Sequence, residues 1–102
     1  MSVAPEIYLP NRRIGQWRQR DTILECVITA FPQAVNYWEK DGRRLTSTAS
    51  SKHHVEIYDE SQHRLTLSLG VHVDDDDDFG EYTCVASNML GKVQKVMTLY
   101  GE

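Results

Sequence analysis

The chain has 102 residues, of which 40% are hydrophobic and 25% are charged, and its net charge at neutral pH is −4. A chain of this length can build one small domain around a single core, and its apolar content is too high for a disordered protein. The charge argues against nucleic-acid binding, because phosphates require a basic surface and residues 53–102 carry three basic and ten acidic side chains.

Short runs that alternate apolar and polar residues recur along the chain between turn residues, and this pattern predicts an all-β fold. No segment shows the sustained 3.6-residue period of a helix. We expect nine strands, at Glu6–Leu9, Arg12–Gln16, Thr22–Ala30, Val35–Glu39, Arg43–Leu45, His54–Tyr58, Leu65–Val73, Gly80–Ser87 and Lys92–Tyr100. The first, third, sixth and seventh runs should form one sheet, and the fourth, eighth and ninth another, which the second run joins.

The alternation gives each strand an inward face. If Cys26 points inward, Leu24 and Ile28 do so as well, and Trp38 is the inward residue of the next strand. Gly42 follows that strand and can supply the positive φ of a tight turn. The other inward positions are expected at Leu65, Leu67, Leu69, Val71, Val73, Tyr82, Cys84, Ala86, Met97 and Leu99.

Four of these residues are hallmarks of an immunoglobulin sandwich. Cys26 and Cys84 lie where such a domain has a disulfide between its sheets, and Trp38 lies where a ring packs on that bridge. Tyr82 precedes the second cysteine by two residues, as does the tyrosine that fixes the preceding corner. We therefore predict an all-β immunoglobulin-like sandwich of two antiparallel sheets, joined by a disulfide that stabilises it by about 4 kcal/mol.

The segment that follows strengthens this assignment. Asp78 and Gly80 complete an Asp-x-Gly-x-Tyr-x-Cys frame, and Asn88 and Gly91 belong to an Ala-x-Asn-x-x-Gly run. Asn88 is expected to hydrogen-bond its own turn, and Gly91 to adopt the left-handed conformation. These motifs resemble an I-set immunoglobulin domain. The resemblance assigns structural roles to Trp38, Asp78, Gly80, Tyr82, Asn88 and Gly91.

Five short motifs support a narrower resemblance. They are Leu24-Glu25-Cys26, Ala30-Phe31-Pro32, Val35-Asn36-Tyr37-Trp38, Asp78-Phe79-Gly80 and Thr98-Leu99-Tyr100. Together they are similar to the third immunoglobulin domain of the lachesin, IgLON and Dpr-interacting-protein family of neural cell-surface proteins. The resemblance implies a secreted or glycolipid-anchored protein of three tandem domains, in which the first makes the main partner contacts and the third is a membrane-proximal spacer. Residues 1–102 would be that one domain, cut from a longer precursor, with Met1 and its neighbours an artificial start.

Five consecutive aspartates, Asp74 to Asp78, follow Val73 and make this part of the chain longer than is usual in such domains. We expect a lengthened or bulged turn here, which leaves the register of the preceding strand open. Calcium takes about six to eight oxygen ligands, whereas consecutive side chains of an extended segment point to alternate sides. The expectation is therefore a solvated turn, with no metal site and no cofactor.

Catalysis is not expected. Asp59, Ser61 and His63 lie close in the sequence, but hydrolysis needs a nucleophile, a base and an orienting group that converge in a pocket. Neighbours on one strand or hairpin seldom converge, and a small sandwich offers no deep cleft. We assign no catalytic residue.

A basic segment near the start of the chain is a second candidate site. It contains Arg12, Arg13, Arg18 and Arg20, of which the last two are expected to share a strand face. Such a patch could meet heparan sulfate or an acidic partner. An ordinary charged surface is the preferred interpretation.

The strongest binding candidate is the outward face of the fourth, eighth and ninth strands. Exposed apolar and aromatic side chains gathered on one sheet face are typical of recognition surfaces, although isolated ones are normal. The face is expected to carry Tyr37, Glu39, Val85 and Val96, flanked by Arg43 and Arg44.

We therefore expect a non-enzymatic immunoglobulin module of an extracellular adhesion or recognition protein at the cell surface, acting as a binding surface or as a spacer. Its partners would be proteins, either copies of itself or other immunoglobulin-superfamily surface proteins. It would reach the membrane only through an anchor of the parent protein, and alone it would be a monomer or a weak dimer. The alternative is an intracellular muscle protein of the titin type, in which the cysteines stay reduced and the domain carries tension.

Overall fold

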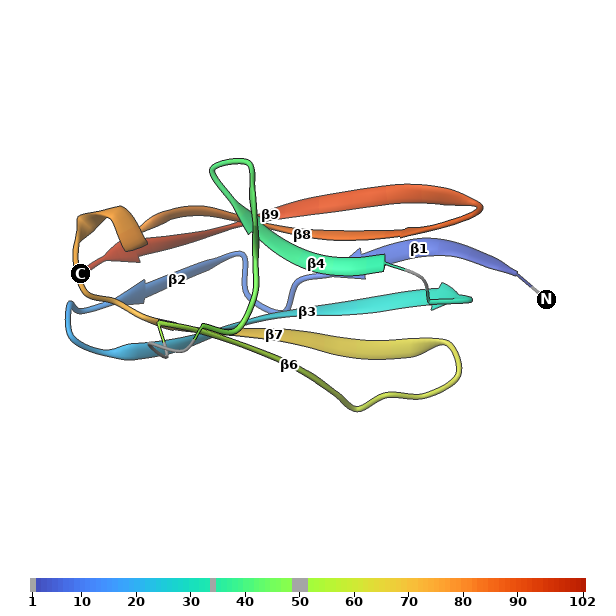
Figure 1. Cartoon of the computed structure of the whole chain (residues 1–102), viewed down its shortest axis with the longest axis horizontal. Coiled ribbons are helices and arrows are strands. Elements are labelled where there is room, and N and C mark those ends of the chain that lie inside the picture. The colour runs from blue at the N-terminus through green and yellow to red at the C-terminus, as the bar shows by residue number, and fades with distance from the viewer. Residues whose placement is uncertain (1, 34, 49–51) are drawn as a thin grey trace.

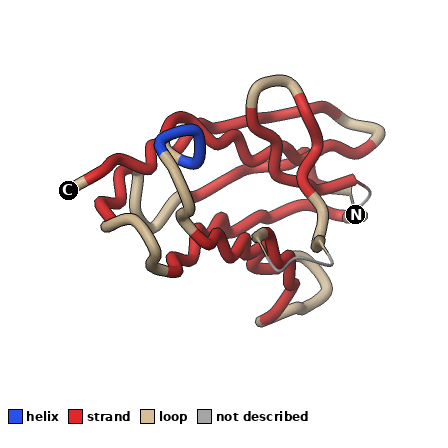
Figure 2. The backbone as a smooth tube through the Cα atoms, turned by 60° about the vertical axis from the view of Figure 1, so that its left-hand side comes forward, coloured by secondary structure: helices blue, strands red, loops and turns tan. Residues whose placement is uncertain are grey.

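A computed structural model describes residues 2–33, 35–48 and 52–102, which form an elongated sandwich with extents of 45 × 24 × 23 Å (Figure 1). Figure 2 shows the strands in two layers, with a single helical turn at one corner. The elements are β1 (Val3–Tyr8), β2 (Arg13–Gln16), β3 (Asp21–Phe31), β4 (Val35–Lys40), β5 (Arg43–Leu45), β6 (His53–Tyr58), β7 (Arg64–His72), the 3₁₀ helix η1 (Asp76–Asp78), β8 (Gly80–Asn88) and β9 (Gly91–Gly101). No helix in these ranges is long and apolar enough to cross a membrane.

Each sheet contains the strands predicted for it, and β5, which had no predicted sheet, pairs with β4. One has the strand order β1-β3-β7-β6, and the other has the order β2-β9-β8-β4-β5. The pair β2–β9 is parallel, and the other neighbours are antiparallel. The chain therefore changes sheet between β1 and β2, where Pro10 cannot donate to a ladder.

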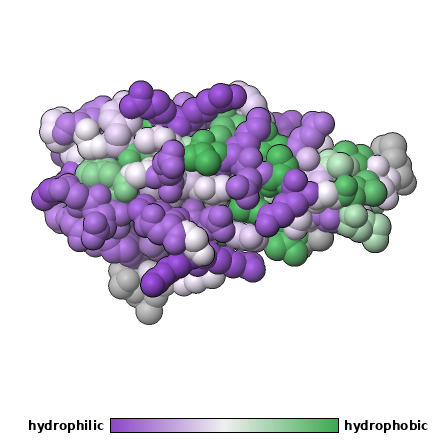
Figure 3. All heavy atoms as spheres, turned by 90° about the horizontal axis from the view of Figure 1, so that it is seen from above, coloured by the Kyte–Doolittle hydropathy of each residue, from purple (hydrophilic) through white to green (hydrophobic). Residues whose placement is uncertain are grey.

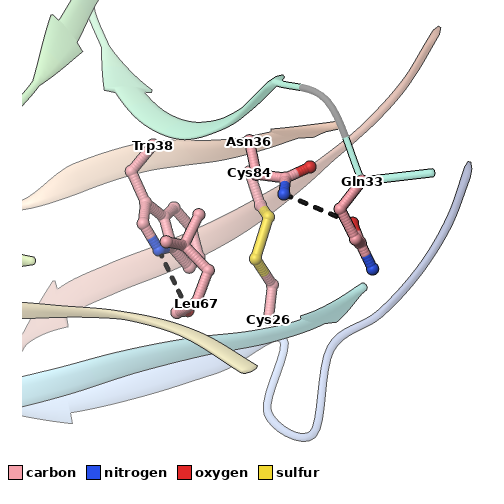
Figure 4. The surroundings of a disulfide bond; sticks show 6 residues. All are labelled: Cys26, Gln33, Asn36, Trp38, Leu67 and Cys84. Carbon is pink, nitrogen blue, oxygen red and sulfur yellow. Dashed lines mark hydrogen bonds between the residues drawn. A yellow bond between two sulfur atoms is a disulfide. The ribbon is translucent and has the colours of Figure 1, made fainter. Parts of the chain in front are cut away.

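The predicted inward positions form the core, and each of them is at most 2% exposed. The disulfide between Cys26 and Cys84 joins β3 to β8, with the two Cα atoms 6.6 Å apart. The indole of Trp38 packs beside this bridge, and its N–H donates a hydrogen bond to the carbonyl of Leu67 at 3.3 Å (Figure 4). The fold class is confirmed: an all-β immunoglobulin sandwich joined by a disulfide between its sheets.

The lengthened turn between β7 and β8 is the capped 3₁₀ helix η1. The carboxylate of Asp75 accepts a hydrogen bond from the backbone N–H of Asp77, and the carboxylate of Asp78 accepts from Asp74 N at 2.8 Å. The hydroxyl of Tyr82 donates to the carbonyl of Asp78 at 2.6 Å, and burial raises the pKa of that hydroxyl. The aspartates thus cap their own turn, and the tyrosine ties it to the core.

The turn glycines behave differently from one another. Gly42 has a φ of 78°, as expected, and Asp41 before it has a φ of 53°. Gly91 is not among the described residues with positive φ, so the prediction of a left-handed Gly91 is wrong. The reason is that Gly91 pairs with Asn88 as the first residue of β9 and is therefore extended. The turn is held instead by the side chain of Asn88, which accepts from Leu90 N at 2.9 Å.

Candidate functional site

The candidate face is the outer surface of the five-stranded sheet. Tyr37 lies opposite Val85, and Glu39 lies opposite Thr83 across the β4–β8 pair. Val96 extends the second row, because it pairs with Thr83 from the other side. Side chains that face each other across a ladder share one side of the sheet, so the strands bring four predicted site residues together.

Val85 is buried, so the prediction that it is exposed on this face is wrong. It is 1% exposed, although it lies outside the main core cluster. It sits on β8, the central strand of the sheet, between Tyr37 on β4 and Gln94 on β9. Its neighbours on both sides cover its small side chain, so Val85 supports the face from below and cannot contact a partner.

Two arginine–aromatic stacks flank the face. The guanidinium of Arg44 lies 4.9 Å from the ring centre of Tyr37, and that of Arg13 lies 4.8 Å from the ring centre of Tyr100. Such stacks hold the arginines in one orientation and leave their N–H groups available. Glu39 is half-buried opposite Arg44, and Arg43 is exposed at the sheet edge.

The sequence interpretation missed three members of this face, which are Val35, Tyr100 and Arg13. Val35 is 42% exposed and Tyr100 is 37% exposed, compared with 46% for Val96, which was predicted. The alternation along β9 contained the signal for Tyr100, because Met97 and Leu99 point inward and the residues between and after them must point outward. The sequence places Arg13 in the basic segment, and its parallel pairing with Thr98 puts it on this face as well.

The arginines at the end of the basic segment do not lie on a strand. Arg18 and Arg20 lie in the turn between β2 and β3, where Gln19 has a φ of 68°. The expectation that these two arginines share a strand face is therefore wrong. Arg18 forms an ion pair with Asp76 of η1 at 2.5 Å, so part of its charge is neutralised within the domain.

Two carboxylates of the aspartate run contact one lysine. The amine of Lys52 lies 2.6 Å from Oδ2 of Asp78 and 3.0 Å from Oδ2 of Asp74, which is where a bound cation would sit between two carboxylates. Burial would raise the pKa of Asp78, but its hydrogen bonds with Lys52 and with two backbone N–H groups lower it. Among the described residues, no three ligand-type side chains gather in a way that could hold a metal ion.

The three residues weighed for catalysis do not form a unit. The hydroxyl of Ser61 donates to the carbonyl of Arg64, and the ring of His63 packs edge-on against Phe31 at 4.8 Å. The hydroxyl and the imidazole therefore have separate partners. Nothing in this geometry supplies an activated nucleophile.

Comparison with known proteins agrees with the architecture. Residues 5–100 match the immunoglobulin I-set domain family. The chain is 31% identical to lachesin of Drosophila melanogaster over 98 residues, covering 95% of this chain and 26% of lachesin. It is 33% identical to neural cell adhesion molecule 1 of Gallus gallus over 89 residues, covering 87% of this chain and 8% of that protein. The chain thus spans only a small part of the length of these relatives.

Two solved structures extend the comparison. A chain in the complex of Dpr2 Ig1–Ig2 with DIP-Theta Ig1–Ig3 superposes with a TM-score of 0.91 at 31% identity, over 99% of this chain and 33% of that one. The titin tandem A164–A165 superposes with a TM-score of 0.81 at 25% identity, over 100% of this chain and 49% of that one. The strand order, the disulfide, the tryptophan beside it and the tyrosine corner lead to the same answer: the chain belongs to the immunoglobulin I-set family.

Proposed function

We propose that this domain is a non-enzymatic module of an extracellular adhesion or recognition protein, and that the outer face of β2-β9-β8-β4-β5 binds another protein. The observation that carries the proposal is that exposed Val35, Val96 and Tyr100 lie along one sheet face, which also carries arginine–aromatic stacks at Tyr37 and Tyr100. Tyrosine and arginine are enriched among residues that dominate binding energy. The relatives named for cell adhesion support the same class of function.

The partner class that we propose is an immunoglobulin-superfamily surface protein, including a second copy of this chain. The solved neighbour is itself a complex between two proteins built of immunoglobulin domains. The disulfide is consistent with an oxidising location, which supports placement outside the cell.

The test is binding by the domain displayed at high density on microspheres. Self-aggregation of the microspheres reports homophilic binding, and capture of a panel of immunoglobulin ectodomains reports heterophilic binding. The double variant Tyr37→Ala with Val96→Asp should abolish either signal. As a matched control, Ile23→Ser removes a similarly exposed side chain from the other sheet and should leave binding intact. Unchanged binding by the double variant would overturn this face, and the domain would then act as a spacer.

We also propose that the parent protein carries this unit as its third, membrane-proximal domain, as the motif resemblance to the lachesin group suggests. The sequence of the parent transcript beyond residue 102 tests this. A hydrophobic tail there supports an anchored protein, and a further immunoglobulin domain there contradicts a membrane-proximal position.

A second candidate is a tension-bearing domain of an intracellular titin-like protein, favoured by the similarity to the titin tandem over the whole chain. The two functions differ in the state of Cys26 and Cys84 in native tissue. Alkylation before reduction, followed by mass spectrometry, should find the cysteines blocked to alkylation if the protein is extracellular. Full alkylation without reduction would favour the titin-like alternative.

A further inference from the structure

The outer face of the four-stranded sheet carries a glycine that the fold does not require. Gly70 lies within β7, between β3 and β6, and its pairing with both neighbours is regular. Its φ is not positive, and an added Cβ would lie 3.6 Å from the Cβ and the carbonyl oxygen of His54, which is an ordinary van der Waals distance. Glycine weakens a strand interior and, where no bulge or bend needs it, marks a place that another chain approaches closely. The space above Gly70 is therefore a candidate binding site.

The missing side chain leaves a hollow of about 230 Å³. Ile23 and His54 pair with Gly70 from the two neighbouring strands and form the walls of the hollow, while Asp21 and His72 close one end. Ile23 is 61% exposed, so the hollow has an apolar wall that is open to solvent. The volume lies below the range of about 300 to 1,000 Å³ that is typical of small-molecule sites, so the hollow suits a single side chain.

Ser68 continues the floor of the hollow. It belongs to the same strand as Gly70 and, by the alternation of β7, faces the same side of the sheet. It is only 6% exposed, and its hydroxyl has no hydrogen-bond partner within residues 2–33, 35–48 and 52–102. In that part of the chain no sealed side-chain polar atom lacks a partner, so this hydroxyl must open toward the surface. A nearly buried hydroxyl that the domain leaves unpaired is a polar group for a ligand to satisfy.

The surroundings of Ser68 are acidic. Glu25 and Glu56 lie opposite it on the two neighbouring strands, and basic Arg64 lies at the far end of β7. The side chain of Glu56 remains 59% exposed although it contacts His54 at 2.6 Å. In Figure 1, β3, β7 and β6 lie below β8 and β9, so Figure 3 shows the opposite side of the molecule, where hydrophobic patches interrupt the hydrophilic surface. The two outer faces therefore differ in chemistry, and carboxylates surround the hollow.

These features together select a basic side chain. The stem of a lysine or an arginine packs well against an apolar surface such as Ile23, while its charged group stays at the rim. At that rim Glu25 and Glu56 offer charge-assisted hydrogen bonds, and Ser68 offers a hydroxyl that accepts. Because Gly70 has no side chain, the backbone that carries the basic residue can also come close to the sheet.

From this geometry we propose that the outer face of the four-stranded sheet binds an extended basic segment of a second protein. One lysine or arginine of that segment lies in the hollow above Gly70, with its charged group at Ser68 between Glu25 and Glu56. The site does not involve the outer face of the five-stranded sheet, and it stands or falls separately from the binding proposed for that face.

Amide NMR spectra of the isotope-labelled chain test the proposal. The probe is the synthetic peptide acetyl-Thr-Lys-Val-Lys-Thr-amide, whose alternation places both lysines on one side of an extended backbone. The amide signals of Ile23, His54, Ser68 and Gly70 should shift together and saturate as the peptide is added. The same peptide with glutamine in place of both lysines is the control and should give no saturable shift.

Two variants locate the site. Glu25→Gln with Glu56→Gln should weaken peptide binding about fivefold or more, because two exposed ion pairs are lost. Gly70→Val fills the hollow and should weaken binding at least as much, and circular dichroism checks its fold. The carboxylate variant tests the site even if Gly70→Val does not fold. Glu60→Gln with Glu81→Gln removes the same charge from exposed positions elsewhere and should leave binding unchanged.

Several results would overturn the proposal. They are an absence of saturable shifts, shifts spread equally over Asp74 to Asp78, and equal binding by the carboxylate variant and the wild-type chain. If n-butylammonium bound as tightly as the peptide, the ligand would be a free amine and not a protein segment. If the same signals shifted on dilution without peptide, the occupant would be a second copy of the chain. Ile23→Ser should weaken peptide binding while leaving binding at the five-stranded sheet intact, so the two faces are read independently.

Discussion

The centre of the sandwich and the corner formed by η1 are stabilised by different kinds of interaction. At the centre, a covalent bridge and the indole of Trp38 lie among side chains that are almost wholly buried and apolar. At the corner, buried Asp78 is satisfied by the amine of Lys52 and by backbone N–H groups. Tyr82 links the two regions, since its ring belongs to the core and its hydroxyl reaches the corner. The centre should respond to reductant and the corner to pH.

Removing the disulfide is expected to give the largest effect. Cys26→Ala with Cys84→Ala frees a loop with a sequence separation of 58 residues. The chain-entropy argument for a loop of this length predicts a loss of about 4 kcal/mol in the free energy of unfolding. Denaturant titration followed by tryptophan fluorescence measures it, and the reduced wild-type chain should show a similar loss. A loss below about 1 kcal/mol would mean that the apolar packing alone holds the centre.

Removing the hydroxyl of Tyr82 should break the hydrogen bond that links the centre to the corner. Tyr82→Phe keeps the buried ring but removes the 2.6 Å hydrogen bond to the carbonyl of Asp78, and we expect it to cost about 1 to 3 kcal/mol. The same denaturant titration reports the change. Tyr100→Phe on the outer face is the matched control and should stay within about 0.5 kcal/mol of wild type. If both substitutions lowered the free energy of unfolding equally, the hydrogen bond of Tyr82 would not stabilise the corner.

Neutralising Lys52 should act on the corner rather than on the disulfide-linked centre. The side chain of Lys52 is 31% exposed, so Lys52→Met should cost only about 1 kcal/mol at neutral pH, because water screens the pair. The pKa of Asp78 is lowered from 3.8, so its stabilisation is present above that pH and is lost as pH falls through the lowered value. The pKa of Lys52 is raised from 10.5, so its stabilisation is present below that pH and is lost as pH rises through the raised value.

Acid unfolding measures the effect at the corner. Without Lys52 the pKa of Asp78 moves upward, and the midpoint of acid unfolding should move to higher pH. Lys95→Met, which removes an exposed lysine elsewhere, should leave that midpoint in place. An unchanged midpoint in the Lys52 variant would show that the backbone N–H groups alone hold Asp78 ionised.

The centre was predictable from sequence, and the corner was predictable only in part. Period-two alternation places Leu24, Cys26 and Ile28 on one face regardless of the rest of the chain, and burial follows from apolar character. The lysine that pairs with Asp78 comes from just before β6, so only the fold reveals it. A contact between charged residues far apart in sequence leaves no periodic signal.

The candidate face shows the same limit. Alternation correctly put Val85 on the outer side of β8, but whether an outward residue is exposed depends on the side chains of the flanking strands. The exposure of Met89, Leu90 and Trp17 has no signal in the sequence, because an apolar residue within a turn belongs to no repeating pattern. It appears only in the three-dimensional structure.

The smallest effect is expected at the edge of the corner, where Asp74 also contacts a histidine. Nδ1 of His72 lies 2.6 Å from Asp21, and Nε2 lies 3.2 Å from Asp74. The hydrogen bond with Asp21 is the main reason that the pKa of His72 is raised above 6.5, against the effects of burial and of the Lys52 charge. His53 provides the contrast, because burial and the same lysine lower its pKa.

Ring-proton NMR over a pH series should therefore find His72 titrating above 6.5 and His53 below it. Asp21→Asn should bring the His72 pKa back toward 6.5 and leave His53 unchanged. Because the folded pKa of His72 is raised, its contribution to stability is present below pH 6.5 and disappears as pH rises through the raised value. If the pKa of His72 did not respond to Asp21→Asn, the carboxylate of Asp74 would be its main partner, and the charge network of the corner would include the end of β7.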